Sequence, residues 1–202
     1  MVPLVLASGS PRRRELLGLL GLAFSVRLAP GEAVPRPGES GPAYAARAAR
    51  EKALAVREIL LVEGAGQAGG AAVLAADTIV LLDGEIFGKP ADYEESFAML
   101  RRLAGRAHQV ITACCLLLPE GSAATLSLTS RVTFWDAPEE ALQAYARSGE
   151  TLDKAGSYAI QGQGGFMVRR IEGSWSNVVG LPVSELVELM LARGLIAPDL
   201  NT

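Results

Sequence analysis

The sequence has few of the residues on which redox and transition-metal chemistry depends. Among 202 residues there are two cysteines and one histidine. The cysteines, Cys114 and Cys115, are adjacent in an apolar run with a strand-like composition. Neighbours in a strand point to opposite faces, so they are poor disulfide partners. We therefore expect no zinc or thiolate-bound metal, and any metal should be a hard cation bound by carboxylates and substrate phosphates.

The sequence also lacks a long apolar run and an excess of positive charge. No segment is long and apolar enough to span a bilayer, and the N-terminus has no signal-peptide pattern. We expect a cytoplasmic protein that does not bind membranes. The net charge is −3 and the pI is about 5.3, which argues against nucleic acid as a partner. Half of the residues are hydrophobic, enough for the core of one domain, or of one domain with two lobes.

A strand–turn–helix pattern near the N-terminus is the first candidate site. The run Pro3–Ala7 predicts a strand, and Ser10 and Pro11 predict a helix start with the serine as N-cap. Three arginines, Arg12–Arg14, occupy the first turn, where their charge opposes the helix dipole. A bound anion would offset this, because amides, hydroxyls and guanidinium groups would converge on phosphate oxygens. The alternative is a solvated basic turn without a ligand.

A hairpin pattern places a carboxylate near a lysine. The Asp-Gly pair at 83–84 lies between two β-prone runs, which predicts a two-residue turn. Counting outward from the turn puts Thr78 opposite Lys89. Asp77 follows a predicted buried strand, residues 72–76, and is thereby brought close to the same lysine. Such a carboxylate is a poor choice for stability unless it is functional, and the alternative is a surface ion pair of little energetic value.

The remaining patterns predict regular elements and three irregular segments. They predict helices at 43–62, 93–103, 138–147 and 183–193, strands at 24–29, 109–118, 124–135 and 166–171, and loops at 30–42, 64–71 and 177–181. The sole histidine, His108, is either a base or a structural hydrogen-bonding group. The glycine-rich tract around Gln161 has no P-loop spacing, and its glycines allow either close approach of a ligand or plain turns.

Five blocks of the sequence, in order, resemble the Maf family of nucleoside triphosphate pyrophosphatases. They are LASGSPRRRELL at 6–17, REKA at 50–53, ADTIVLLDGEIFGKP at 76–90, HQVIT at 108–112 and DKAGSYAIQGQGGFMVRRIEGSWSNVVGLPVSEL at 153–186. Each block alone is a weak signal, but together they cover essentially the whole chain.

The resemblance implies an α/β fold and a hydrolytic activity. The fold would be one domain over residues 1–202, with two lobes around a long, twisted mixed β-sheet similar to that of the inosine triphosphatase group. The site would lie in the cleft between the lobes. The activity would convert a nucleoside triphosphate to the monophosphate and diphosphate with a divalent cation, Mg²⁺ or Mn²⁺. The family also implies a homodimer.

The resemblance assigns five residues to the phosphates of the substrate. Ser8, Arg12 and Arg13 would bind the substrate through its phosphates, in agreement with the unusual basic turn. Lys52 and Lys89 would neutralise the charge that builds up on the triphosphate, a role suited to compact ammonium groups.

The resemblance also assigns the carboxylates. Asp77 would be the general base, or a metal-linked carboxylate, that prepares the attacking water, and Glu32 would serve the metal with it. The family usually has two acidic residues in this segment, and the second is the functional one, whereas here Glu32 is followed by Ala33. Either Glu32 takes over, or Glu39 reaches the site, or the activity is reduced.

Three positions distinguish branches of the family. Here they are Arg12, Thr78 and Gln161, a set that looks like the branch acting on dTTP and UTP. Thr78 and Gln161 would line the base or sugar side, and an amide can both donate to and accept from a uracil or thymine edge. The alternatives are a 7-methyl-GTP pyrophosphatase, and a nucleotide-binding regulator of septum formation and cell division with little turnover.

Overall fold

The computed structural model describes residues 2–64 and 70–197 of the chain. The elements follow one another as β1 (Leu4–Leu6), α1 (Pro11–Gly18), β2 (Phe24–Val26), α2 (Gly41–Gly64), β3 (Ala72–Leu82), β4 (Glu85–Phe87), α3 (Tyr93–Leu103), β5 (Ala107–Leu117), β6 (Ala123–Phe134), α4 (Glu139–Ala146), the 3₁₀ turns η2 (Ala155–Ser157) and η3 (Gln163–Met167), β7 (Val168–Glu172), α5 (Trp175–Val179) and α6 (Val183–Ala192). None of the helices in these two ranges has the length and apolar character needed to cross a membrane.

The strands form one mixed sheet. Their order is β2-β1-β3-β5-β6-β7, and β4 pairs with β3. β1 pairs in parallel with β2 and with β3, whereas the β3–β4 and β6–β7 pairs are antiparallel. The chain divides into two compact units. Unit 1 contains residues 1–77, 113–127 and 180–202, and unit 2 contains residues 78–112 and 128–179. The expected α/β fold with a mixed sheet is confirmed.

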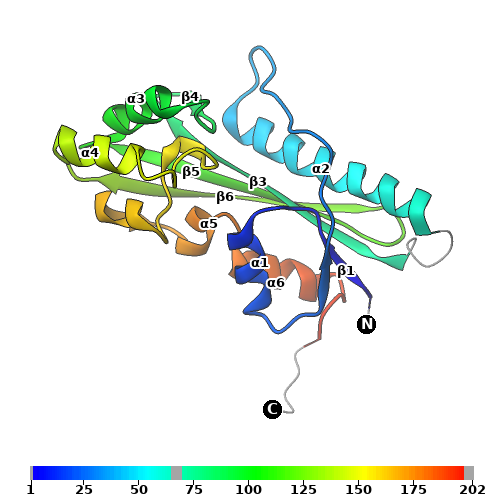
Figure 1. Cartoon of the computed structure of the whole chain (residues 1–202). Coiled ribbons are helices and arrows are strands. Elements are labelled where there is room, and N and C mark those ends of the chain that lie inside the picture. The colour runs from blue at the N-terminus through cyan, green and yellow to red at the C-terminus, as the bar shows by residue number, and fades with distance from the viewer. Residues whose placement is uncertain (1, 65–69, 198–202) are drawn as a thin grey trace. The chain divides into compact units, whose positions relative to one another are not determined.

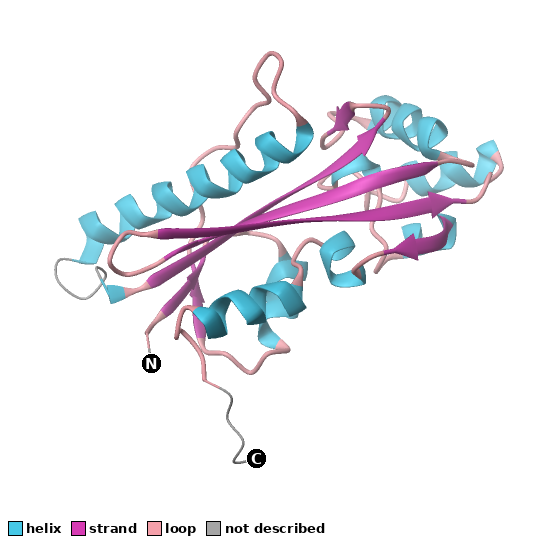
Figure 2. Ribbon diagram, turned by 180° about the vertical axis from the view of Figure 1, so that it is seen from behind, coloured by secondary structure: helices cyan, strands magenta, loops and turns pink. Residues whose placement is uncertain are grey.

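Unit 1 carries helices on both faces of its part of the sheet. α2 covers one face, and α1 and α6 cover the other (Figures 1 and 2). The alanine-rich face of α2 packs closely because its buried members, Ala45, Ala48, Ala49 and Ala53, have small side chains. Arg57 ties α2 to the ends of two strands, since its guanidinium donates to the carbonyls of Ala71 and Leu118 at 3.2 and 2.7 Å.

Unit 2 has an aromatic core beneath α3 and α4. Phe134, His108 and Tyr158 pack edge to face with centroid distances of 4.8–5.5 Å. Nearby, Gly156 has a φ of 68°, and a Cβ there would lie 2.8 Å from Cγ2 of Val80. Glycine is therefore needed at this position both for its backbone conformation and for space.

Several local predictions are confirmed. Ser10 caps α1, with its Oγ accepting from the amide of Arg13 at 3.4 Å, and Asp92 caps α3 through the amide of Glu95 at 2.8 Å. The hairpin has the expected register, with Leu82 opposite Glu85. Positive φ values at both turn residues, Asp83 and Gly84, are those that a type I′ turn requires.

Four segments differ from the sequence-based expectation. The strand expected at 24–29 ends at Val26. The strand expected at 72–76 continues without a break to Leu82, because the half-buried pair at 77–78 keeps extended geometry. The strand expected at 166–171 begins only at Val168, after a 3₁₀ turn. The loop expected at 177–181 is partly helical, since α5 covers Trp175–Val179. Most of the loop expected at 64–71 lies outside the described residues.

Candidate active site

The first turn of α1 folds Arg13 back onto the preceding loop. The Ser8 side chain is buried, and its Oγ receives hydrogen bonds from the Ser10 amide and the Arg13 guanidinium, both at 3.2 Å. Nε of Arg13 also donates to the carbonyl of Gly180 at 2.8 Å. The basic turn is therefore not simply solvated: Arg13 is built into the loop, and the half-buried Arg12 precedes it.

Asp77 and Lys52 form a largely buried ion pair in unit 1. Nζ of Lys52 lies 2.5 Å from Oδ1 of Asp77, and the two side chains are 18% and 13% exposed. Lys52 extends from α2 and Asp77 from the middle of β3. Ion pairs that are withdrawn from water gain more from their mutual attraction than surface pairs, but they also pay for desolvation. The Asp77 carboxylate is therefore mostly withdrawn from solvent and pairs with Lys52.

The charges of Asp77 and Glu32 both reach Arg13. Burial lowers the pKa of the Arg13 guanidinium, while the negative charges of Asp77 and Glu32 act in the opposite direction. Burial also raises the pKa of Tyr44, and the same two carboxylates raise it further. Within unit 1, Arg13 therefore contacts Ser8 and interacts with the charges of Asp77 and Glu32. Asp77 in turn pairs with Lys52.

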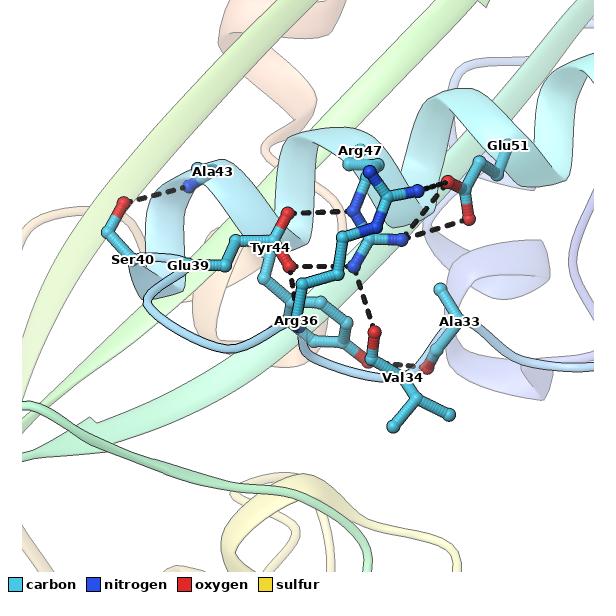
Figure 3. A network of polar contacts seen from close by, with 9 residues as sticks. All are labelled: Ala33, Val34, Arg36, Glu39, Ser40, Ala43, Tyr44, Arg47 and Glu51. Carbon is cyan, nitrogen blue, oxygen red and sulfur yellow. Dashed lines mark hydrogen bonds and ion pairs between the residues drawn. The ribbon is translucent and has the colours of Figure 1, made fainter.

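The segment that carries Glu32 is fixed to α2 by Tyr44 and Arg47 (Figure 3). The Tyr44 hydroxyl donates to the carbonyl of Ala33 at 2.9 Å. The Arg47 guanidinium donates to both carboxylate oxygens of Glu39 at 2.7 Å and to the Val34 carbonyl at 2.9 Å. These contacts, which we call the α2 clamp, hold the backbone at Ala33, where the acidic residue is missing, and at the residue that follows it.

Glu39 is committed to the α2 clamp. The hydrogen bonds from the Arg47 side chain, together with the amide of Arg36, lower the pKa of Glu39 to about 2. A carboxylate held by a two-pronged guanidinium is not available to replace the acidic residue absent at Ala33. Of the alternatives left open by the sequence, the one in which Glu39 reaches the site is wrong.

Thr78, Lys89 and Gln161 belong to unit 2. Oγ1 of Thr78 lies 2.9 Å from Oγ1 of Thr112. Lys89 follows β4 by two residues, and both Lys89 and Gln161 are exposed.

The glycine tract around Gln161 makes room for protein side chains. A Cβ at Gly162 would lie 1.9 Å from Oε1 of Glu150, and one at Gly164 would lie 2.4 Å from the Tyr145 hydroxyl. Glu150 also accepts from the amide of Gln163 at 3.0 Å. At these two glycines the space that a side chain would need is taken by Glu150 and Tyr145, and the close approach of a ligand stays a prediction.

His108 is a structural residue. It is 2% exposed, and its Nε2 lies 2.8 Å from the Tyr158 hydroxyl. Burial lowers its pKa to about 4, so it is neutral at pH 7. Cys114 is also inert, because burial raises the pKa of its thiol to about 12, and both cysteines are free and buried.

A hard cation fits the donor set better than a protein-only metal cage. Within residues 2–64 and 70–197, no three His, Cys, Asp or Glu side chains are grouped closely enough to hold a metal ion. Mg²⁺ is commonly bound by one or two carboxylates together with substrate phosphates. Asp77 and Glu32, which act on the same arginine, have the chemistry of such a set.

Sequence reasoning missed the residues that support the site. Tyr44, Arg47, Thr112 and Glu150 bind backbone or side chains of the predicted site segments. Only Arg47 had a local signal, its spacing of four residues from Glu51, which it contacts at 3.0 Å. The other contacts join segments that are distant in the sequence.

Comparisons with known proteins cover nearly the whole chain. Residues 3–193 match the family described as Maf-like protein. A protein named dTTP/UTP pyrophosphatase from Nitratidesulfovibrio vulgaris is 54% identical over 196 residues, which is 96% of this chain and 89% of that protein. A protein of the same name from Myxococcus xanthus is 51% identical over 195 residues, covering 96% and 94% of the two chains.

A solved structure supports the fold alone. The structure of a HAM1 protein from Coxiella burnetii covers 96% of this chain and 100% of its own, with a TM-score of 0.51 and 15% sequence identity. At that identity the likeness concerns the arrangement of strands and helices and not the chemistry.

Proposed function

Because the chain belongs to the family of Maf-like proteins, we propose that it is a nucleoside triphosphate pyrophosphatase acting on dTTP and UTP. The products are the nucleoside monophosphate and diphosphate. The observation that carries the proposal is the largely buried Lys52–Asp77 pair, whose carboxylate acts electrostatically on the Arg13 side chain of the basic turn.

Asp77 prepares the attacking water. Its carboxylate accepts a proton from the water as the oxygen forms a bond to phosphorus, and the anhydride bond between the α and β phosphates breaks. The electron pair of that bond leaves with the diphosphate. Lys52 orients the carboxylate through the contact at 2.5 Å. Its positive charge also offsets the charge that develops on the phosphates.

The basic turn and the second lysine bind the triphosphate. Ser8, Arg12 and Arg13 supply a hydroxyl and two guanidinium groups, which match phosphate oxygens in geometry and charge. The Arg13 side chain is already oriented by Ser8 and Gly180, so little conformational freedom is lost on binding. Lys89 neutralises charge on the same phosphates.

A divalent cation, Mg²⁺ or Mn²⁺, completes the site. Asp77 and Glu32 would hold it together with the phosphates, and it would withdraw charge from the phosphate oxygens. The tether of the Glu32 segment to α2 through Tyr44 supports this assignment.

Diphosphate release from a set of nucleoside triphosphates tests the proposed function. We expect diphosphate release from dTTP and UTP to exceed that from CTP, 7-methyl-GTP and the common purine triphosphates, with magnesium or manganese present and with loss on chelation. A preference for 7-methyl-GTP would agree with pyrophosphatase activity, but it would overturn the assignment of Arg12, Thr78 and Gln161 to pyrimidine selection.

A nucleotide-binding regulator with little turnover is the second candidate. The observation that favours it is Ala33, where a carboxylate is absent and Glu39 cannot replace it. The variant Asp77→Asn separates the two, since an enzyme loses turnover and keeps triphosphate binding. Wild-type protein that binds dTTP but matches Asp77→Asn in turnover would favour the regulator.

The wider organisation follows the family. We propose that residues 1–202 form a single domain, that the protein is a homodimer, and that it works in the cytoplasm. Light scattering on the purified protein checks the oligomeric state, and a monomeric mass would contradict the dimer.

A further inference from the structure

A chain of hydrogen bonds in unit 2 ends at Thr78. Oγ1 of Thr112 donates to the main-chain carbonyl of Asn177 at 2.9 Å, and it also lies 2.9 Å from Oγ1 of Thr78. Thr112 and Asn177 are completely buried, whereas Thr78 is half-buried. We call these three residues the Thr112 relay.

The direction of each hydrogen bond in the relay follows from the number of protons. A threonine hydroxyl has one proton, and a carbonyl oxygen only accepts. If Thr112 donates to the Asn177 carbonyl, the second contact is satisfied only when Thr78 donates to Thr112. The opposite direction leaves the Asn177 carbonyl without this partner, in a place where buried polar groups are normally hydrogen-bonded. The Thr78 proton is therefore directed at Thr112.

The acceptor at the inner end of the relay is held in place. The side-chain amide of Asn177 donates to the Val110 carbonyl at 3.1 Å and to Oγ of Ser130 at 2.9 Å. Val110 lies on β5, the strand that also carries Thr112. Ser130 is fully buried and accepts from the amide of Ser174 at 3.0 Å. The Asn177 carbonyl cannot turn away without breaking these contacts.

We propose that Thr112 is a positioning residue that makes Thr78 a hydrogen-bond acceptor toward the substrate, and that this acceptor selects the imide N–H of uracil and thymine. The inference rests on the proposed function and deepens it. N3 of uracil and thymine carries a proton, whereas N3 of cytosine is an acceptor. Two acceptors facing each other repel, so a Thr78 hydroxyl committed to Thr112 favours dTTP and UTP and disfavours CTP.

Four variants test the relay. Thr112→Val removes the hydroxyl with little change of shape and releases the Thr78 proton, which can then be donated to N3 of cytosine. Thr78→Val removes the selecting group itself, and the double variant combines the two. Thr112→Ser is the matched control, because it retains a hydroxyl that can relay the proton. The measured quantity is the ratio of kcat/KM for UTP to that for CTP.

We expect Thr112→Val to lower this ratio about tenfold, partly through a rise in kcat/KM for CTP, and Thr112→Ser to restore it. In the Thr78→Val background, the further change Thr112→Val should leave the ratio unmoved, since Thr112 acts only through Thr78. A merely structural role would lower both activities by one factor, and that result would overturn the proposal.

Equilibrium binding keeps the test independent of turnover. The same variants are titrated with UMP, CMP and 3′-deoxy-UMP, and the UMP-to-CMP affinity ratio should fall in Thr112→Val. A changed preference between UMP and 3′-deoxy-UMP instead would assign Thr78 to the sugar hydroxyl and overturn selection of the imide. Wild-type protein without diphosphate release from UTP would refute the proposed function, whereas an unchanged UMP-to-CMP ratio, or no binding of either, would refute the relay.

Discussion

At the scale of single residues, His108 makes the stability of the protein depend on pH. Its folded pKa is about 4 because it is buried, against 6.5 in the unfolded chain. Below pH 6.5, His108 therefore binds a proton in the unfolded chain, whereas in the folded protein it binds one only near pH 4. The stabilisation is fully present above pH 6.5 and is lost as the pH falls, with a total of about 3 kcal/mol.

Denaturant titration from pH 7 to pH 4 measures this effect. We expect the free energy of unfolding of the wild type to decline more steeply than that of His108→Gln, which cannot titrate. The variant should be less stable at pH 7, because it alters the contact with Tyr158, and the gap should narrow toward pH 4. Parallel pH profiles would show that His108 is protonated in the folded state as readily as in the unfolded chain.

At the scale of elements, we expect the α2 clamp to keep the loop at 30–42 ordered, because it holds that loop to α2. Arg47 contacts Glu39, Glu51 and the Val34 carbonyl simultaneously, so Arg47→Met removes several anchors and keeps the aliphatic stem. We expect faster proteolysis within residues 30–40 and a loss in kcat/KM of about tenfold, since small displacements of substrate-binding groups are costly.

Arg36→Met is the matched control for the clamp. Arg36 belongs to the same network, but its side chain is 66% exposed and contacts Glu51 at 3.3 Å, and exposed pairs of this kind contribute little. We expect wild-type proteolysis and activity for this variant. Equal effects of the two substitutions would mean that net charge, and not anchoring, controls the segment.

Elements whose signals are local could be predicted from the sequence. Ser10 and Asp92 cap their helices through amides three residues away, and the Asp83-Gly84 turn sets the hairpin register through its own backbone geometry. The grouping of Lys52 with Asp77, 25 residues apart, came from the family resemblance, because no rule of periodicity joins a helix lysine to a strand carboxylate.

Features that depend on distant contacts could not be predicted. Residues 175–179 lack a clear helical pattern, and α5 is accompanied by contacts of Asn177 with Val110 and Ser130, which are 67 and 47 residues away. The commitment of Glu39 to Arg47 was also hidden, because several arginines were equally available in the sequence. In both cases tertiary partners decided among options that were locally similar.

At the scale of the whole molecule, the three longest strands join the two compact units. β3, β5 and β6 each contribute residues to both units. Unfolding one unit would break these three strands in the middle. We therefore expect one cooperative unfolding transition, in agreement with a single domain.

The positions of the tryptophans allow a direct test of this cooperativity. Both Trp135 and Trp175 lie in unit 2, so their fluorescence reports that unit. Leu74 lies in unit 1 and is fully buried, and Leu74→Ala should cost about 2–5 kcal/mol. If the units unfold together, this substitution shifts the fluorescence transition as far as the far-ultraviolet circular dichroism transition.

Met167→Ala, the matched change in the core of unit 2, should shift both signals together as well. If Leu74→Ala leaves the midpoint of the fluorescence transition unchanged while it shifts the midpoint of the circular dichroism transition, the two units unfold separately.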